Sequence, residues 1–511
     1  MNTRNITLFE RYLRYGNIFA SLFSQILTYD MRFLFCLFFI QISWTQVNVQ
    51  QTVNAFVQDA VNRHAKITFQ AMDIETGQVI ASYNENQAIP GASTTKLFST
   101  ATAFQLLGEN YRMKTRIYCD GFIDQDSVLH GNVWIRGGGD VSLGSKFFSF
   151  ENQELTFLNA WTDSLKSKGI KFIEGSVIAD ASEFGYDGTP ATWHSGDVGN
   201  YYGAFASGIN FYDNTVKLKF NTGNSGTKAQ FVGMFPEVPG FQLENQVLAS
   251  NVGSDETIVY GGAYELNRSI KGTLPSHVTN FIVKGSMPDP ENQLAIEWEK
   301  VLLQNGIQVE DGAKGYRLHQ KELHANTYEN KSLLFQVEGE TVKDIANWTN
   351  LKSVNVFADG LVHALAYQKT GKGNLTVGLN LIKEFWKDTI NLEGFEIYDG
   401  SGLSRSNSIS AAHFCHLLRY MSSSTNANSY KNTLPIAGKT GTAKSLCKGD
   451  IGEGRVFAKS GSMQGVKSYA GYIDSTSGKK IAFAITVNDF SCTGNQLTIR
   501  MENIFNALAQ Y

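Results

Sequence analysis

The chain has 511 residues, of which 42% are hydrophobic and 18% charged, and its formal net charge is −3. This composition is typical of a folded globular protein and excludes an intrinsically disordered chain. The sequence has no basic run interleaved with aromatic residues, so we expect no nucleic-acid partner. Its length indicates two or three domains.

The N-terminal region contains an apolar run, Met31–Ser43, that opens with one arginine and is followed by polar residues. The run is too short to cross a bilayer as a mature helix, and this order of parts is typical of a secretory signal peptide. We therefore predict a gene-model extension or disordered segment over 1–30, a signal peptide over 31–45, and an exported, periplasmic protein. No small-residue cleavage site is clear, so an uncleaved N-terminal anchor with peripheral membrane association stays open.

The segment after the predicted signal peptide carries the pattern of a helix, a hairpin and a second helix. Apolar residues at helical spacing predict the first helix over Gln50–Ala65. Alternating residues predict a β-hairpin of Ile67–Asp73 and Val79–Tyr83. An apolar helix is then predicted over Ser93–Leu107, so the first segment ends with a helix that opens with a serine.

From about Tyr111 to about Tyr328 the chain changes to short strands separated by glycine and aspartate turns. The predicted strands are Lys114–Cys119, Asn132–Arg136, Gly175–Ala179, Thr215–Phe220 and Asn280–Lys284, and one helix is predicted over Pro290–Asn305. We interpret this region as a β-rich insertion within another domain. We predict one inserted domain over 111–210 and 286–328, and a second, nested β-rich domain over 211–285.

Helical and then strand patterns return in the last part of the chain. The predicted helices are Thr341–Trp348, Val354–Gln368, Ala411–Met421 and Gln496–Ala509, and the predicted strands are Val456–Lys459, Ser468–Asp474 and Lys480–Asn488. We therefore predict one discontinuous domain over 46–110 and 329–511. The predicted fold class is α+β, with an antiparallel sheet flanked by helices and interrupted by nested β-rich domains.

The helix that opens with a serine carries the first chemical motif, Ser93-Thr94-Thr95-Lys96. Residues i and i+3 of a helix share a face, so the Lys96 amine can reach the Ser93 hydroxyl. A lysine serves as a base only if burial lowers its pKa from about 10.4 toward roughly 7–8. A lone S-x-x-K is more often a simple helix start, and the same spacing occurs in three polar, loop-like stretches, Ser225/Lys228, Ser445/Lys448 and Ser477/Lys480.

Two further motifs accompany S-x-x-K in serine acyl-transfer enzymes, an S-x-N loop and a K-T-G strand. Ser353-Val354-Asn355 supplies the S-x-N between two predicted helices. Lys439-Thr440-Gly441 fits the third triplet literally, but no strand pattern encloses it. Lys459-Ser460-Gly461 ends a predicted strand, along which an extended peptide can lie while the lysine binds a carboxylate. We therefore assign the third motif to Lys459.

These motifs resemble the D-alanyl-D-alanine carboxypeptidase/endopeptidase family of low-molecular-mass penicillin-binding proteins, in the branch with large insertions between the first two motifs. The matching stretches, over about residues 50 to 510, are GASTTK, SVN, DGSGLSRSN and AKSGSMQG, with RGGGD and GSVIAD inside the insertion. One departure is Ser460, where threonine is commoner. The resemblance implies a penicillin-binding/serine β-lactamase-like acyl-transfer domain with nested inserted domains.

The resemblance also implies a role for each matching residue. Ser93 would be the acylated nucleophile and Lys96 its base. Ser353 would relay a proton to the leaving amine, Asn355 would bind the substrate amide, and Lys459 would hold the terminal carboxylate. The substrate-binding positions implied are Ser460, Gly461, Ser462, Gln464, Arg405 and Asp197. The backbone N–H groups of Ser93 and Ser462 would form the oxyanion hole. Asp197 would face a free amine on the third residue of the peptide. The alternative for Asp197 is a solvated loop carboxylate without a role in binding.

His413, Cys415 and His416 gather two histidines and a cysteine on one predicted helix turn. Their i, i+2, i+3 spacing does not converge on one ion, so we expect structural side chains there. We predict no metal and no cofactor. The cysteines of the mature chain are too few for a disulfide framework, and a single bridge between Cys447 and Cys492 stays open.

Three functions stay open at this point. The first is hydrolysis of D-alanyl-D-alanine or cross-link bonds in peptidoglycan stem peptides through an acyl-enzyme, with β-lactams as covalent inhibitors. The second is a β-lactamase or esterase of the same fold, which would turn penicillin over rapidly instead of forming a stable adduct. The third is a non-catalytic wall-binding homologue. We favour the first, and the preference for carboxypeptidase or endopeptidase activity stays open.

Overall fold

The computed structural model describes residues 48–150, 153–320 and 324–511. The predicted signal peptide at 31–45 and the segment before it therefore lie outside the described residues. Residues Val49–Gln510 cluster as one compact unit. Within the described ranges, no helix combines the length and the apolar character needed to span a bilayer.

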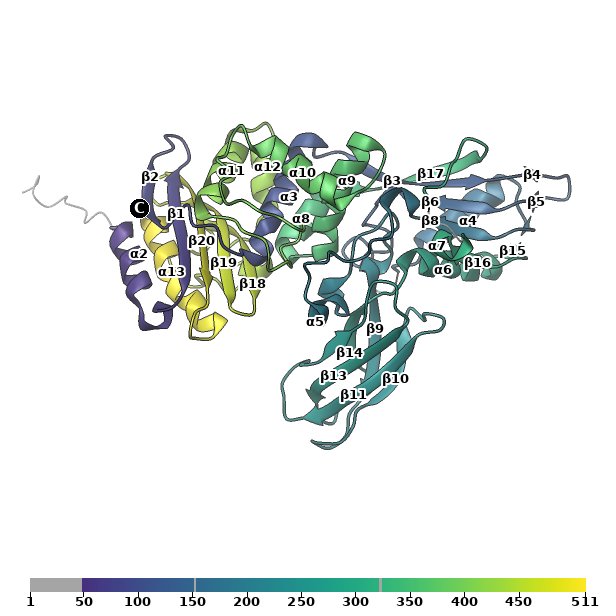
Figure 1. The fold of residues 1–511 in the computed structure, drawn as a ribbon, viewed down its shortest axis with the longest axis horizontal. Coiled ribbons are helices and arrows are strands. Elements are labelled where there is room, and N and C mark those ends of the chain that lie inside the picture. Colours follow the sequence, from purple (N-terminus) through teal and green to yellow (C-terminus); the bar gives the residue numbers. More distant parts are fainter. Residues whose placement is uncertain (1–47, 151–152, 321–323) are drawn as a thin grey trace, which may run out of the picture. The chain divides into compact units, whose positions relative to one another are not determined.

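A five-stranded antiparallel sheet joins both ends of the described chain (Figure 1). Its strand order is β18-β19-β20-β1-β2, with bounds Val456–Met463, Val466–Asp474, Lys480–Asn488, Lys66–Asp73 and Val79–Tyr83. β1 pairs with β20 along its whole length, from Lys66 opposite Asn488 to Asp73 opposite Ile481. Every residue of β20 after Lys480 is buried, which explains the nearly continuous apolar run in this strand. The predicted strands and hairpin of this region are confirmed.

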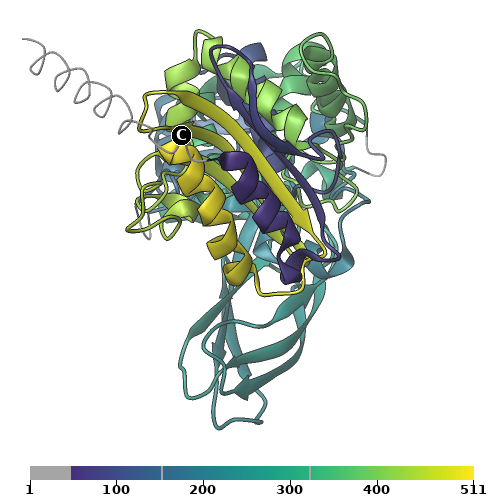
Figure 2. The ribbon, with the colours of Figure 1, turned by 90° about the vertical axis from the view of Figure 1, so that its left-hand side faces the viewer.

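Helices cover both faces of this sheet. The first and last helices, α2 (Val49–Gln58) and α13 (Gly494–Gln510), lie side by side against one face (Figure 2). α11 (Ala411–Ser423) packs on the other face against β1 and β20. Behind it lie α3, α8, α9, α10 and α12, with bounds Lys96–Leu106, Val342–Lys352, Asn355–Thr370, Leu375–Trp386 and Ala427–Asn432. The predicted antiparallel sheet flanked by helices is therefore confirmed.

α3 is the central helix of the core. All of its residues from Lys96 to Phe104 are buried. The ring of Phe98 contacts the rings of Trp386, Phe395 and Phe414, at centroid distances of 6.1, 4.7 and 5.6 Å. The helix that carries the first motif is thus held rigidly from several sides, which fixes the side chains at its start.

The region between α3 and α8 forms four further sheets in the described part of the chain. Two of them, in the orders β16-β8-β6-β3-β17 and β15-β7-β5-β4, pack with α4 (Phe157–Ser167) and α6 (Pro290–Gln304). Their strands are β3 Arg112–Cys119, β4 Phe122–Ile123, β5 Val128–His130, β6 Val133–Arg136, β7 Phe172–Ile173, β8 Val177–Asp180, β15 Gln308–Val309, β16 Ala313–Gly315 and β17 Ser332–Thr341.

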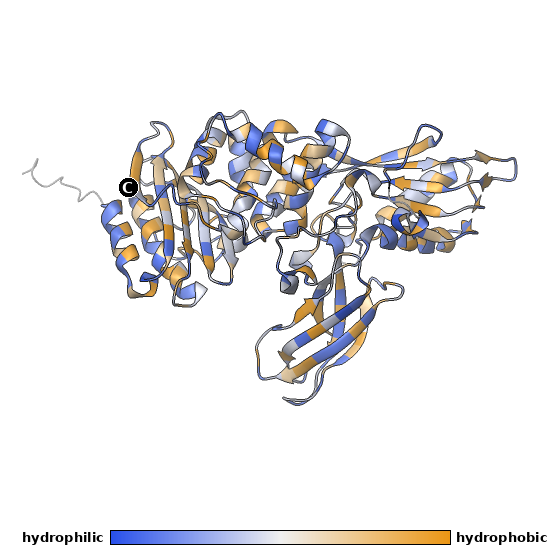
Figure 3. Cartoon of the chain, viewed as in Figure 1, coloured by the Kyte–Doolittle hydropathy of each residue, from blue (hydrophilic) through white to orange (hydrophobic). Residues whose placement is uncertain are grey.

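The other two sheets, β10-β9-β14 and β11-β13-β12, occupy the part of the chain predicted as the nested domain. Their strands are β9 Thr215–Asn221, β10 Gln230–Phe235, β11 Gln242–Ser250, β12 Ile258–Tyr260, β13 Asn267–Pro275 and β14 Phe281–Ser286. Hydrophilic and hydrophobic residues alternate along several of these strands (Figure 3). Each sheet therefore has one exposed and one packed face. Short helices α5 (Ser195–Val198) and α7 (Tyr316–His319) connect the elements.

The structure corrects the sequence-based map of this region at one boundary. Residues from 329 onward were assigned to the acyl-transfer domain, and no strand was predicted between residue 329 and the helix predicted at Thr341–Trp348. β17 (Ser332–Thr341) instead pairs antiparallel with β3, from Ser332 opposite Cys119 to Thr341 opposite Arg112. The first inserted domain therefore continues beyond its predicted end at 328.

The four cysteines in the described ranges, Cys119, Cys415, Cys447 and Cys492, are all free thiols. The bridge between Cys447 and Cys492 is therefore not formed. Within the described residues the fold depends on its hydrophobic clusters, without a disulfide.

Candidate active site

Ser93 lies in a tight turn that leads into α3. The sequence predicted an α-helix from Ser93, but the structure places a 3-10 turn, η2 (Ala92–Thr95), before α3 begins at Lys96. Ala92 has a positive φ of 49°, and a Cβ atom at Gly402 would lie 2.0 Å from its carbonyl oxygen. This close packing holds the turn, and Ser93 is left partly exposed at its surface.

The Lys96 side chain is fully buried beside Ser93. Its Nζ lies 2.9 Å from Ser93 Oγ and 2.6 Å from Asn355 Oδ1, and it also donates to the carbonyl oxygen of Ser401. Three acceptors match the three hydrogens of an ammonium group. Burial lowers the pKa of Lys96 to about 8, although the carboxyl groups of Asp359 and Asp399 act in the opposite direction. A useful fraction of this amine is therefore neutral near pH 7, as a base requires.

The S-x-N segment brings its hydroxyl and its amide to the same place. Ser353 ends α8 in the left-handed conformation, with a φ of 61°, and α9 begins two residues later at Asn355. Ser353 Oγ accepts a hydrogen bond of 2.9 Å from Lys459 Nζ. Asn355 Nδ2 donates to the carbonyl oxygen of Tyr202 at 2.6 Å, which turns its amide oxygen toward Lys96.

Lys459 and Lys439, the two candidates for the third motif, have different environments. Lys459 is fully buried on β18, and its Nζ also contacts the Ser460 carbonyl oxygen at 2.6 Å. Burial and the nearby Lys96 lower the pKa of Lys459 well below its ordinary value. Lys439 is exposed, and its triplet leads into the short turn η6 (Gly441–Ala443). The structure thus brings Lys459 to Ser353.

The glycine of the third motif lets β18 approach the Ser93 turn. A Cβ atom at Gly461 would lie 2.2 Å from Ser468 Oγ, 2.4 Å from the Gly91 carbonyl oxygen and 3.0 Å from the Ser93 nitrogen. Ser468, on β19, donates to the same Gly91 oxygen at 2.5 Å. Ser460 faces the η6 segment, where its hydroxyl donates to Thr442 Oγ1 at 2.8 Å. Sequence reasoning gave no indication of this contact with Thr442.

A pocket of about 590 Å³ opens over these groups. The predicted site residues that line it are Ser93, Ser353, Asn355, Asp197, Arg405, Ser462 and Gln464. Asp197 Oδ1 accepts a hydrogen bond of 3.3 Å from the Tyr202 hydroxyl, and Arg405 Nη1 donates to the Gln464 carbonyl oxygen at 3.5 Å. Lys96 and Lys459 are fully buried and do not line the pocket, but their amines contact Ser93 Oγ and Ser353 Oγ. Three lysines that no motif indicated, Lys146, Lys284 and Lys352, also line the pocket.

Asp399 organises the loop that receives Lys96. It is fully buried and accepts hydrogen bonds from the Trp193 indole at 2.7 Å, the Ser404 backbone at 2.7 Å and the Gly402 backbone at 2.9 Å. The Asn407 amide and the Ser401 hydroxyl complete its set, at 2.7 and 3.1 Å. The loop from 399 to 407 is therefore fixed, and with it the carbonyl group that binds Lys96.

The histidine and cysteine cluster on α11 plays a structural part. His413 Nδ1 accepts from the Ser410 backbone at 3.1 Å as part of the helix cap, and the Cys415 thiol donates to the Gln70 carbonyl oxygen at 3.4 Å. Burial lowers the pKa of His413 to about 4. No group of three or more metal-ligating side chains converges within the described residues.

The chain is similar to known proteins over nearly the whole of its described length. The sequence profile of the D-Ala-D-Ala carboxypeptidase 3 (S13) family matches residues 49–510. The chain is 23% identical over 458 residues to a D-alanyl-D-alanine carboxypeptidase of an Actinomadura species, covering 87% of this chain and 81% of that protein. It is 24% identical over 465 residues to the D-alanyl-D-alanine carboxypeptidase DacB of Haemophilus influenzae, covering 88% and 92%.

The fold is similar to that of solved penicillin-binding structures. The crystal structure of penicillin-binding protein 4 from Haemophilus influenzae superposes with a TM-score of 0.77 at 24% identity, covering 90% of this chain and 99% of that chain. A structure of the same protein complexed with a novel β-lactam gives a TM-score of 0.68 at 21% identity, with coverage of 90% and 100%. The predicted penicillin-binding fold with additional domains is confirmed.

Proposed function

The chain belongs to the D-Ala-D-Ala carboxypeptidase 3 (S13) family, and we propose that it releases the terminal D-alanine of peptidoglycan peptides through an acyl-enzyme on Ser93. It is a serine-type D-alanyl-D-alanine carboxypeptidase. The observation that carries the role of Ser93 is the 2.9 Å contact between its hydroxyl and the buried Lys96 amine. A hydroxyl beside an amine with a lowered pKa is the arrangement that an activated serine requires.

In the first half of the reaction, the neutral Lys96 amine takes the Ser93 proton while Oγ attacks the carbonyl carbon of the penultimate D-alanine. The negative charge that develops on the carbonyl oxygen is stabilised by the backbone N–H groups of Ser93 and Ser462. The C–N bond then breaks. Ser353 relays to the leaving amine the proton that Lys96 took from Ser93, so free D-alanine departs and an ester to Ser93 remains.

In the second half, water attacks the ester, and Ser93 regains its proton as the shortened peptide leaves as a carboxylic acid. Asn355 has one side-chain N–H left after its contact with Tyr202, and this N–H binds a carbonyl oxygen of the peptide. The Lys459 amine and the Ser460 hydroxyl are assigned to the terminal carboxylate, whose negative charge would favour the protonated form of Lys459. Lys459 Nζ donates a hydrogen bond of 2.9 Å to Ser353 Oγ, so the residue proposed to bind the carboxylate contacts the residue proposed to relay the proton.

The outer pocket supports a longer peptide than D-alanyl-D-alanine alone. Asp197, held by Tyr202, supplies a carboxylate for a free amine on the third residue. Arg405 and Gln464 line the same pocket and contact each other. We assign them to the walls of the peptide-binding groove, where cleavage of cross-linked peptides would be accommodated as well.

Inhibition and location follow from the same proposal. A strained β-lactam amide presented to Ser93 would form an ester that blocks the enzyme, in line with the β-lactam complex of the related penicillin-binding protein 4. The apolar run at Met31–Ser43 supports export to the periplasm, with peripheral membrane association if the segment is not removed.

A fluorescent penicillin tests the proposal directly. Wild type and Ser225→Ala, a change in an exposed S-x-x-K of the same spacing, are expected to give a stable labelled band and to release D-alanine from a D-alanyl-D-alanine peptide. Ser93→Ala is expected to lose both. Label on Ser93→Ala would overturn the assignment of the nucleophile, and rapid turnover of penicillin by wild type would identify a β-lactamase instead.

A further inference from the structure

Asp359 is a buried acidic residue that the proposed reaction does not use. It lies one helical turn after Asn355 on α9, in the apolar stretch Val356–Leu361, and is 2% exposed. Burying a carboxyl group in such surroundings is unfavourable unless its interactions compensate. Its interactions therefore indicate what it does.

The contacts of Asp359 lead to Lys96. Its Oδ1 accepts a hydrogen bond of 2.6 Å from the Gly400 backbone N–H, and the Gly400 carbonyl oxygen accepts from Ser99 of α3 at 2.7 Å. The next carbonyl along the chain, that of Ser401, receives the Lys96 ammonium. Asp359 thus anchors the 399–400 peptide unit, two units before the Ser401 carbonyl group that receives Lys96.

Asp359 accepts fewer hydrogen bonds than its neighbour Asp399. Asp399 accepts five hydrogen bonds, whereas Asp359 Oδ2 has no hydrogen-bond partner among the described residues. Burial and the proximity of Asp399 raise the pKa of Asp359 to about 7, against the opposing effect of Lys96. Asp359 therefore changes charge near neutral pH.

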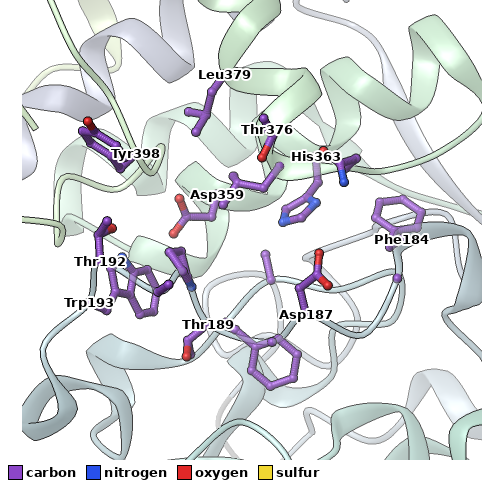
Figure 4. A pocket seen from close by; sticks show the side chains of 18 of the residues that line it. Phe184, Asp187, Thr189, Thr192, Trp193, Asp359, His363, Thr376, Leu379 and Tyr398 are labelled. Atoms are coloured by element: carbon purple, nitrogen blue, oxygen red, sulfur yellow. The ribbon is translucent and has the colours of Figure 1, made fainter. Parts of the chain in front are cut away.

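Asp359 lines a second cavity of about 490 Å³, which does not include Ser93. Figure 4 shows the Asp359 carboxyl group next to Trp193 and Thr192 in the wall of this cavity. Thr192 Oγ1 is a further buried polar atom without a hydrogen-bond partner among the described residues. Tyr398, which is 43% exposed, lines the cavity as well, so the cavity reaches the surface.

We propose that Asp359 is a positioning residue for Lys96: it anchors the start of the loop whose Ser401 carbonyl group binds Lys96, and the gain or loss of its own negative charge changes how readily Lys96 loses its proton. The inference rests on the proposed function of Lys96 as the base. An ionised Asp359 stabilises the ammonium form of Lys96, and a neutral Asp359 favours the free amine.

Several other charged and titratable groups face this pair. Asp187, in the loop between β8 and α5, lines the second cavity. His363 of α9 lines it as well, and its Nδ1 lies 2.8 Å from the Gly373 carbonyl oxygen. The Lys383–Glu396 ion pair of 2.5 Å closes the rim, and Lys459 and Asp399 act on Lys96 directly. All of these groups remain when Asp359 alone is changed.

The decisive variant is Asp359→Asn, because its amide oxygen keeps an acceptor for Gly400 while the charge is removed. The second-order rate of acylation by fluorescent penicillin is measured from pH 5 to pH 10 for wild type and variant. Because wild-type Asp359 is charged mainly above about pH 7, we expect the midpoint of the variant to move to lower pH by up to about one unit, with the difference above pH 7 and with the two normalised profiles coinciding at pH 5 to 6. An exposed carboxylate, Asp388→Asn, serves as the matched control and should leave the midpoint unchanged.

An unchanged midpoint in a folded Asp359→Asn enzyme would overturn the inference while leaving the proposed function intact, because wild type would still be labelled on Ser93. Infrared spectroscopy of wild type labelled with ¹³C-aspartate covers the case of a variant that does not fold. It should detect a buried carboxyl group that titrates near pH 7 and whose titration shifts when Ser93 is acylated. A carboxyl titration that ignores acylation would likewise count against a link to Lys96.

Discussion

Gly461 lies so close to the Ser93 turn that a side chain at position 461 has no room. A Cβ atom there would be 3.0 Å from the Ser93 backbone nitrogen and 2.4 Å from the Gly91 carbonyl oxygen. These contacts join β18, on which Lys459 lies, to the turn that carries the proposed nucleophile. Because residue 461 is a glycine, without a side chain, the strand that carries Lys459 can lie this close to the Ser93 turn.

We expect Gly461→Ala to separate β18 from the Ser93 turn. Overpacking of this kind costs about 1–3 kcal/mol in stability. The variant should unfold at a lower temperature and acylate with fluorescent penicillin at least about tenfold more slowly, since the proposed N–H donors and Lys459 move apart. Gly494→Ala, at a site with no atom within 4 Å of the added carbon, should change neither property. Normal acylation by Gly461→Ala would contradict the close packing.

Lys459→Ala should abolish most of the activity, and Lys439→Ala should not. The first change removes the buried amine that lies 2.9 Å from Ser353 Oγ, whereas Lys439 is exposed. Loss of a positioned proton-transfer partner lowers rates by about 100-fold or more. Release of D-alanine from a peptide substrate measures the effect. The opposite result, with activity lost only in Lys439→Ala, would reverse the assignment of the third motif.

Acylation of the wild-type enzyme should increase with pH and reach a plateau above about pH 8, the pKa to which burial lowers Lys96. Only the neutral amine can accept the Ser93 proton, so the rate should fall about tenfold for each pH unit below that value. Stopped-flow measurements with a chromogenic β-lactam provide the profile. A rate independent of pH between 5 and 9 would exclude Lys96 as the base.

His413 should make the folded state less stable in acid. Its pKa is about 4 in the folded protein and about 6.5 in an unfolded chain, so folding favours the neutral ring. The stability is fully present above pH 6.5 and decreases as the pH falls to 4, by up to about 3 kcal/mol. Urea unfolding of His413→Gln should show a smaller decrease over this range than wild type. The exposed His64→Gln should match wild type, and identical profiles for all three proteins would refute the prediction.

The sequence predicted those elements whose signal is local. The apolar run of β20 and the helical spacing after Ser93 both led to the observed elements. α10 (Leu375–Trp386) was missed because it contains Gly378, which weakens the helical pattern. The structure explains this residue: a Cβ atom at 378 would lie 2.2 Å from the Val362 carbonyl oxygen. The glycine is required by the packing of α10 on α9, which no local pattern records.

The candidate site shows the same division. Spacing alone predicted that Lys96 can reach Ser93, and the two side chains are 2.9 Å apart. The contacts that hold the loop around Lys96 were not predicted. Asp359 bonds Gly400 and Trp193 bonds Asp399, and each pair joins residues that are far apart in the sequence. A single acid in the apolar stretch VFADGLV was nevertheless a usable signal for Asp359.

The pairing of β1 with β20 has a consequence for how the enzyme comes into being. β1 pairs with β2 on one side, but the partners of residues 66–73 on the other side are residues 481–488, so the middle of this sheet forms only after about four-fifths of the polypeptide has followed β1. The inserted sheets close over shorter loops and are able to form earlier. A nascent chain halted before β20 would carry folded inserts and an unassembled Ser93 centre, so the capacity to bind penicillin would emerge as one of the last events in biogenesis.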